Sequence, residues 1–114
     1  MPEDHYELAA PILPGKLEKW KSMLGEINGP RKKDYQASRK KIWIRHERVW
    51  FQHTPQGDFA LLSFEGKDTS KALEKLMNSR DPFDKWFAEN LKDIHGIEVA
   101  TSPVPISQLY LDIL

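Results

Sequence analysis

The chain has 114 residues, and its 17 basic and 17 acidic side chains give no formal net charge. This length suits a single domain over residues 1–114. The balanced charge excludes a protein that attracts polyanions through its net positive charge. The absence of cysteine excludes a disulfide framework and a thiolate nucleophile. We find no secretory signal and no apolar run of about 20 residues, so we expect a cytoplasmic protein that does not enter a membrane.

The first part of the chain predicts one strand and two helical segments. Residues 5–13 form a short apolar run that ends at Pro14-Gly15, as a first strand would. Apolar residues then recur at helical spacings of three and four: Leu17, Trp20, Leu24 and Ile27. We expect this helix to break at Gly29-Pro30 and a polar, basic segment to follow over 30–41.

The second part of the chain predicts a hairpin, further helices and a fourth strand. Residues 42–54 and 59–65 are rich in branched and aromatic side chains, and we place the turn between them at Gln56-Gly57. One helix follows Asp68. Another helix starts with Asp81 as its N-cap. Strand four follows at 97–101, and residues 102–114 form an extension. The order β-α-β-β-α-β predicts an α+β, ferredoxin-like antiparallel sheet with helices on one face.

The two faces of this predicted sheet differ in character. One face is apolar and belongs under the helices: Val49, Phe51, His53, Ala60, Leu62 and Phe64. The other face mixes large apolar residues (Trp50, Phe59, Leu61) with polar ones (His46, Arg48, Gln52, Ser63, Glu65). A monomer rarely leaves such an apolar patch bare. We therefore expect a homodimer in which a second copy covers this face and the polar residues line a small-molecule cavity.

Several short motifs resemble the dimeric α+β barrel superfamily of ferredoxin-like proteins, in a small uncharacterised branch. They are Pro14-Gly15-Lys16, Glu47-Arg48-Val49-Trp50, Gln56-Gly57-Asp58 and the stretch from Asp81 to Phe87, and the resemblance covers roughly residues 5–100. It implies paired sheets in a homodimer, a fold shared by cofactor-free oxygenases, polyketide cyclases, haem-degrading enzymes and proteins of no known activity. Trp43 stands where the resemblance implies a small residue.

Asp84 and His46 are the candidate catalytic residues. Asp84 follows Pro82 at the offset where the resemblance implies a cavity-facing histidine, and a carboxylate in an apolar pocket gains the raised pKa of a general base. Its other interpretation is the acid of a capping box, at the positive end of a helix. His46 suits proton transfer near neutral pH, or is a histidine at the rim of the sheet.

The remaining candidate residues would bind the ligand. Arg48 and Glu65 are expected cross-strand neighbours, which either pair with each other or fix and orient an acidic substrate. Trp50 and Gln52 supply an apolar wall and one polar group, as ligand sites typically show. Ser63 and Trp86 complete the set. No spacing supports a metal site, and the resemblance implies a haem-binding imidazole at the position that Asp84 occupies here, so we expect no metal and no cofactor.

The function predicted from these residues is that of a homodimeric small-molecule-binding domain. It is either a binding protein or a cofactor-independent cyclase, monooxygenase or proton-transfer enzyme for an aromatic or carbonyl compound. One alternative is an RNA-binding module, because residues 31–48 hold eight Lys or Arg against two acids. Leu61 stands where a second base-stacking aromatic belongs, which makes nucleic acid the weaker prediction. A non-catalytic structural dimer is the third.

Overall fold

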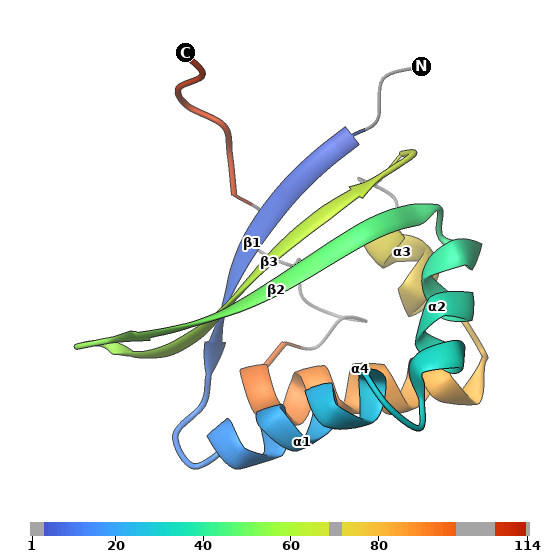
Figure 1. Cartoon of the computed structure of the whole chain (residues 1–114), viewed down its shortest axis with the longest axis horizontal. Helices are drawn as coiled ribbons and strands as arrows, with labels where there is room; N and C mark the ends of the chain where they lie inside the picture. The colour runs from blue at the N-terminus through green and yellow to red at the C-terminus, as the bar shows by residue number, and fades with distance from the viewer. Residues whose placement is uncertain (1–3, 69–71, 98–106, 114) are drawn as a thin grey trace.

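The computed structural model describes residues 4–68, 72–97 and 107–113. The strands are β1 (Asp4–Ile12), β2 (Ile44–Thr54) and β3 (Gly57–Gly66), and the helices are α1 (Leu17–Ile27), α2 (Lys32–Lys41), α3 (Ala72–Met77) and α4 (Pro82–His95). The strands form an antiparallel sheet in the order β1-β3-β2, with the helices on one side of it (Figure 1). The α+β class is confirmed. All but one residue of the predicted fourth strand lies outside the described residues, so the four-stranded ferredoxin-like order is not shown.

The start of α4 follows the predicted capping chemistry. The side chain of Asp81 accepts a hydrogen bond of 2.8 Å from the backbone N–H of Phe83, and Pro82 occupies the first helical position. At the other end Gly96 adopts a left-handed conformation with φ of 70°, which glycine tolerates without a steric penalty. No helix within the described ranges is long and apolar enough to cross a membrane.

The core lies between the sheet and the helices. One cluster joins β1, β3, α1 and α4 and consists of Ile12, Trp20, Met23, Ala60 and Ile94. A second, smaller cluster near α3 consists of Ile42, Ile44 and Ala72, with Phe64 packed against it. Burial of each large side chain contributes roughly 1.5–3 kcal/mol, and these clusters hold the helices on one face of the sheet.

The hairpin register differs from the predicted one by two residues. Thr54 pairs with Gly57, so the loop is Pro55-Gln56, and the predicted turn at Gln56-Gly57 is wrong. The physical reason is Pro55, which has no N–H to donate and therefore belongs in the loop instead of the strand ladder. Because side chains alternate with a period of two, a shift of two residues leaves every side chain on its predicted face.

One part of the helix-covered face extends past the helices. The tip of the β2–β3 hairpin projects beyond α1 and α4 (Figure 1). Phe51 is consequently 43% exposed, although its ring lies 5.8 Å from that of Trp20, and His53 is exposed as well. The prediction that both residues lie under the helices is therefore wrong for His53 and only partly right for Phe51.

A β-bulge interrupts β2 at its start. Ile44 pairs with Gly66 and His46 pairs with Glu65, so Arg45 is an extra residue on β2. The bulge turns Ile44 toward the helices, where it is buried, and leaves His46 on the opposite face.

Candidate functional site

The predicted site residues fall on two sides of the sheet. Six of them share the outer face, which the helices do not cover: His46, Arg48, Trp50, Gln52, Ser63 and Glu65. The other two, Asp84 and Trp86, belong to α4 on the helix side. Trp86 packs against the core there, with the guanidinium of Arg31 4.1 Å from its ring centroid. Within one chain the structure therefore does not bring Asp84 or Trp86 to the outer face.

The predicted pair of Arg48 and Glu65 is wrong, because the two-residue shift in register places Arg48 opposite Ser63. The carboxylate of Glu65 instead has three basic neighbours: His46 Nδ1 at 3.3 Å, Arg45 Nη2 at 3.4 Å and His5 Nδ1 at 3.6 Å. His5 Nε2 also lies 3.2 Å from Ser63 Oγ. This end of the outer face is thus a polar cluster, whereas Trp50 farther along the same face is 45% exposed.

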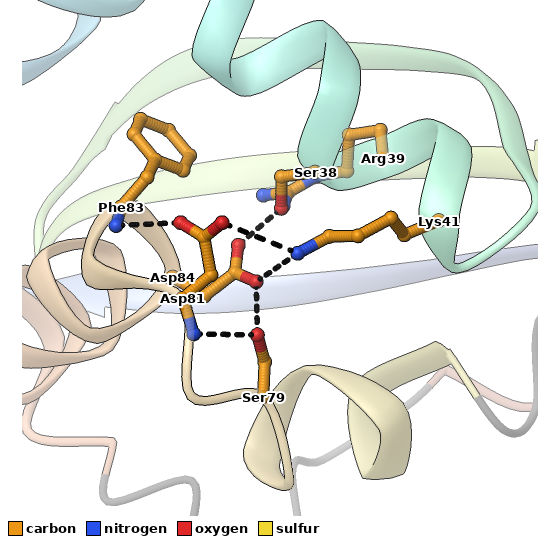
Figure 2. Close-up of polar contacts among 7 residues, drawn as sticks. All are labelled: Ser38, Arg39, Lys41, Ser79, Asp81, Phe83 and Asp84. Carbon is orange, nitrogen blue, oxygen red and sulfur yellow. Dashed lines mark hydrogen bonds and ion pairs between the residues drawn. The ribbon is translucent and has the colours of Figure 1, made fainter.

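Asp84 lies in the first turn of α4 and its side chain is only 2% exposed. Its carboxylate accepts hydrogen bonds from the hydroxyls of Ser38 and Ser79, and Lys41 Nζ donates to it over 3.1 Å (Figure 2). Asp84 is not the capping-box partner of Asp81, because the backbone N–H of Asp81 donates to Ser79 Oγ at 3.2 Å. The carboxylate therefore joins α2 to the turn that precedes α4.

The electrostatic surroundings keep Asp84 ionised. Burial alone would raise the pKa of this carboxyl, but the hydrogen bonds from Ser38, Ser79 and Lys41 outweigh burial and hold the pKa below its ordinary value. A general base works best with a pKa near the operating pH. The geometry thus favours a structural role for Asp84.

Arg39 is the centre of the polar network, although sequence reasoning did not single it out. Its side chain is buried, and its Nε donates to Glu47 Oε1 over 3.0 Å while its Nη1 donates to Ser38 Oγ over 3.2 Å. The guanidinium lies between two rings, 4.1 Å from the centroid of Tyr35 and 4.5 Å from that of Phe87. One charged side chain thereby connects α2, β2 and α4.

Burial shifts both members of the Arg39–Glu47 pair toward their neutral forms. It lowers the pKa of Arg39 to about 10, against the opposing effect of Asp84, and it raises the pKa of Glu47 to about 8. Both shifts oppose the charged forms, and the two side chains meet as a buried pair at 3.0 Å. Asp84 and Lys41 form the second charged pair of the network, at 3.1 Å.

An apolar cavity of about 60 Å³ lies beside Arg39, between the sheet and α3 and α4. Arg39 and His95 are its polar lining residues, and the others are apolar: Leu8, Ala10, Ile42, Ile44, Leu62, Phe64, Ala72, Leu76, Phe87, Leu91 and Ile97. Its composition, with few polar groups and perturbed pKa values, is typical of ligand sites, whereas its volume is well below their usual range of about 300–1,000 Å³.

His95, the last residue of α4, is buried under β1. Its Nδ1 donates to the backbone oxygen of Pro11 over 2.8 Å. Burial lowers the pKa of His95, and the hydrogen bond to Pro11 only partly opposes that effect. The ring is therefore neutral at pH 7, with Nε2 as the nitrogen that can accept a proton. Proton transfer beside a carbonyl requires one group that polarises the carbonyl oxygen and one that accepts the proton. Arg39 can supply the first and His95 the second.

One sequence signal could have found part of this site. Glu47 alternates with Val49 and Phe51, so it lies on the apolar face of β2, where an acid needs a buried partner. Arg39 gave no such signal, since it is one of many basic residues in its segment.

Comparison with known proteins adds no relative: no family model matches this chain, no curated protein matches it, and no solved structure resembles it closely enough to count as a match. The resemblance to dimeric α+β barrels therefore stays a prediction.

We expect Asp84→Ala to lower the free energy of unfolding by roughly 2–4 kcal/mol, because it leaves two buried hydroxyls and an ammonium group without their acceptor. Urea unfolding followed by circular dichroism measures this loss. Asp93→Ala on the same helix is the matched control, since Asp93 forms ion pairs with Lys16 and Lys19 at the surface and its loss should cost clearly less than that of Asp84. Equal losses in the two variants would contradict the structural role of Asp84.

The second prediction concerns pH. The folded chain keeps the Glu47 proton up to about pH 8, whereas the unfolded chain releases it near 4.5, so Glu47 makes stability fall as pH rises between these values. Glu47→Gln keeps an acceptor for Arg39 and removes this dependence. We expect the variant to gain at least about 1.4 kcal/mol over the parent between pH 5 and pH 8, the equivalent of one pKa unit. Parallel stability curves for the two proteins would refute the shift, and Glu18→Gln, an exposed acid on α1, is the control.

Proposed function

We propose that this protein binds a small molecule with a short apolar body and one carboxylate or carbonyl oxygen in the cavity beside Arg39. The observation that carries the proposal is the guanidinium of Arg39. It has five N–H donors, and its Nη2 has no hydrogen-bond partner among the described residues. A buried donor without a partner costs about 1–3 kcal/mol, and a ligand oxygen in the cavity would satisfy it.

The charge of the network supports an anionic ligand. Burial raises the pKa of Glu47, which favours its neutral form beside Arg39, and Asp84 is shared between Arg39 and Lys41. A carboxylate at Arg39 would pair with the remaining donors of the guanidinium. Arginine is also the side chain whose planar donor fork matches a carboxylate.

The size of the cavity limits the apolar body of the ligand. About 60 Å³ corresponds to roughly two water molecules, whereas a cavity that takes benzene measures about 150 Å³. The volume therefore favours a short aliphatic carbonyl compound or carboxylate over the aromatic compound that the sequence also suggested. Butyrate, whose apolar body of three carbon atoms is half that of benzene, is a suitable probe.

We propose further that the protein acts as a homodimer whose second copy covers the outer face of the sheet. Trp50 is 45% exposed at the centre of this face. The segment 107–113 begins beside the same face, where the N–H of Ser107 donates to the backbone oxygen of Glu7 over 2.8 Å. Its large apolar side chains are the most exposed ones of that type among the described residues: Leu109 at 80%, Tyr110 at 89%, Leu111 at 72% and Ile113 at 73%. Apolar area of this extent supports an interface.

Butyrate should bind with a Kd of about 1 mM, since six atoms at about 0.7 kcal/mol each give about 4 kcal/mol. Titration followed by ¹H–¹⁵N nuclear magnetic resonance should shift the signals of cavity residues such as Leu8 and Leu76. We expect 1-butanol, which has no charge, to bind about tenfold more weakly, because it cannot pair with the guanidinium.

Three variants separate the cavity from general effects. Arg39→Met should abolish butyrate binding, whereas Arg31→Met should not, because Arg31 also stacks on an aromatic ring but does not line the cavity. Ala72→Leu fills the cavity, retains Arg39 and should also block binding. Equal binding of butyrate and 1-butanol, or unchanged binding in Ala72→Leu, would contradict the proposal.

Sedimentation velocity tests the dimer directly. The parent chain should be a dimer at about 10 μM, and Trp50→Lys should weaken the dimer by at least about tenfold, since it places a charge in an apolar interface. Ser22→Lys, an exposed position on α1 on the helix side of the sheet, should leave the association unchanged. A monomeric parent chain at this concentration would disprove the interface and leave the cavity proposal untouched.

A further inference from the structure

Trp43, between the end of α2 and the start of β2, is held in an unusual conformation. Its φ of 62° lies in the left-handed region, where residues with bulky side chains are rare. The backbone oxygen of Trp43 accepts a hydrogen bond of 3.0 Å from the N–H of Lys67, and its N–H donates to the oxygen of Lys40 over 3.2 Å. The backbone of residue 66 can approach Trp43 this closely only because it is a glycine: a Cβ there would lie 2.2 Å from the backbone oxygen of Trp43. Strain of this kind tends to persist at functional positions.

This backbone conformation presents the indole to solvent. Trp43 is 50% exposed, although a large aromatic residue gains most from burial. The ammonium group of Lys75 lies 3.1 Å from the centroid of the indole and that of Lys67 lies 5.8 Å from it. Two positive charges therefore lie next to an exposed, planar aromatic surface.

A groove of about 660 Å³ opens on the same ring, between α2 and β2. Its lining is aromatic and basic: Tyr35, Gln36, Lys40, Trp43, Arg45 and His46 are among its residues. The one acid that lines it, Glu47, is bound to Arg39. The groove is within the size range of small-molecule sites, and it is distinct in shape and polarity from the closed apolar cavity on the other side of Arg39.

We propose that this groove binds a nucleotide, with the base stacked on Trp43 and the phosphates next to Lys40, Arg45 and Lys67. A planar ring and an anionic tail are the two ligand features that an exposed indole and surrounding cations recognise together. Among the described residues that line the groove, Trp43 is the exposed stacking platform, and β3 carries Leu61 where an RNA-binding sheet would offer its second aromatic residue. A single nucleotide fits this arrangement better than a strand of RNA. The proposal does not depend on the ligand of the cavity.

The test compares ADP with its two halves, adenosine and pyrophosphate, by calorimetry and by the indole N–H signals of the four tryptophans. ADP should bind at least about tenfold more tightly than either half, and the signal of Trp43 should shift while that of Trp50 stays in place. Trp43→Asn removes the ring but suits a left-handed backbone, and it should weaken ADP binding about tenfold or more. Lys33→Ala, an exposed position on α2 that does not line the groove, should have no effect.

Charge is tested separately from stacking. Lys40→Ala should weaken ADP binding several-fold and leave adenosine unchanged. Binding of ADP no tighter than that of pyrophosphate would reduce the site to non-specific attraction of phosphate and overturn the proposal. Unchanged ADP affinity in Trp43→Asn would overturn it as well. An oligoadenylate that binds more than about a hundredfold tighter than ADP, with a steep salt dependence, would replace the nucleotide with a nucleic-acid strand.

Discussion

The burial of Arg39 is the constraint on which the arrangement of the helices depends. A guanidinium out of water must be paired, and its partners come from different elements: Glu47 from β2, Ser38 from α2 and, through Ser38, Asp84 from α4. The helix α2 has few apolar residues of its own to bury, and Tyr35 is the main one. Its position against the sheet is therefore fixed by polar pairs to a degree unusual for a helix in a small domain. The apolar cavity exists beside these pairs because α3 and α4 meet the sheet on the other side of Arg39.

Much of the fold followed from local patterns in the sequence. The period of two in 42–54 and 59–65 assigned the faces of the hairpin correctly even though the register was wrong, and the sequence Asp81-Pro82 located the start of α4. These patterns act over a few residues, and the structure obeys them because nothing at longer range opposes them. The register depended on a choice between two turns, which Pro55 decided by its missing N–H.

The site was much less predictable, because its residues meet across long stretches of chain. Ser38 and Asp84 are 46 positions apart, and no spacing in the sequence connects them. Composition marks 31–48 as basic, but it does not say that Arg39 turns inward while Lys40 and Lys41 remain exposed. Only the packing of α2 against Phe87 and Glu47 makes that distinction. The predicted outer-face residues do share a surface, since their grouping follows from strand alternation alone.

The helix α2 thus serves two proposed binding regions from consecutive positions. Arg39 lines the closed cavity and also reaches the open groove, whereas Lys40 lines the groove. Because adjacent helical residues point about 100° apart, one short helix can supply both regions. A ligand in either region would then contact the same Arg39 side chain, which gives the two regions a direct physical connection.

The bulge at Arg45 has a consequence for how the chain tolerates insertions and deletions. It divides β2 into two stretches whose alternation is out of phase, so that Ile44 and Glu47 point to the same side although they are three residues apart. Loss of one residue here would remove the bulge and leave a regular ladder, with Ile44 still opposite Gly66 and still on the helix side. A one-residue deletion at the bulge should therefore be tolerated better than one farther along β2, where it would turn the side chains on one side of the deletion to the opposite face.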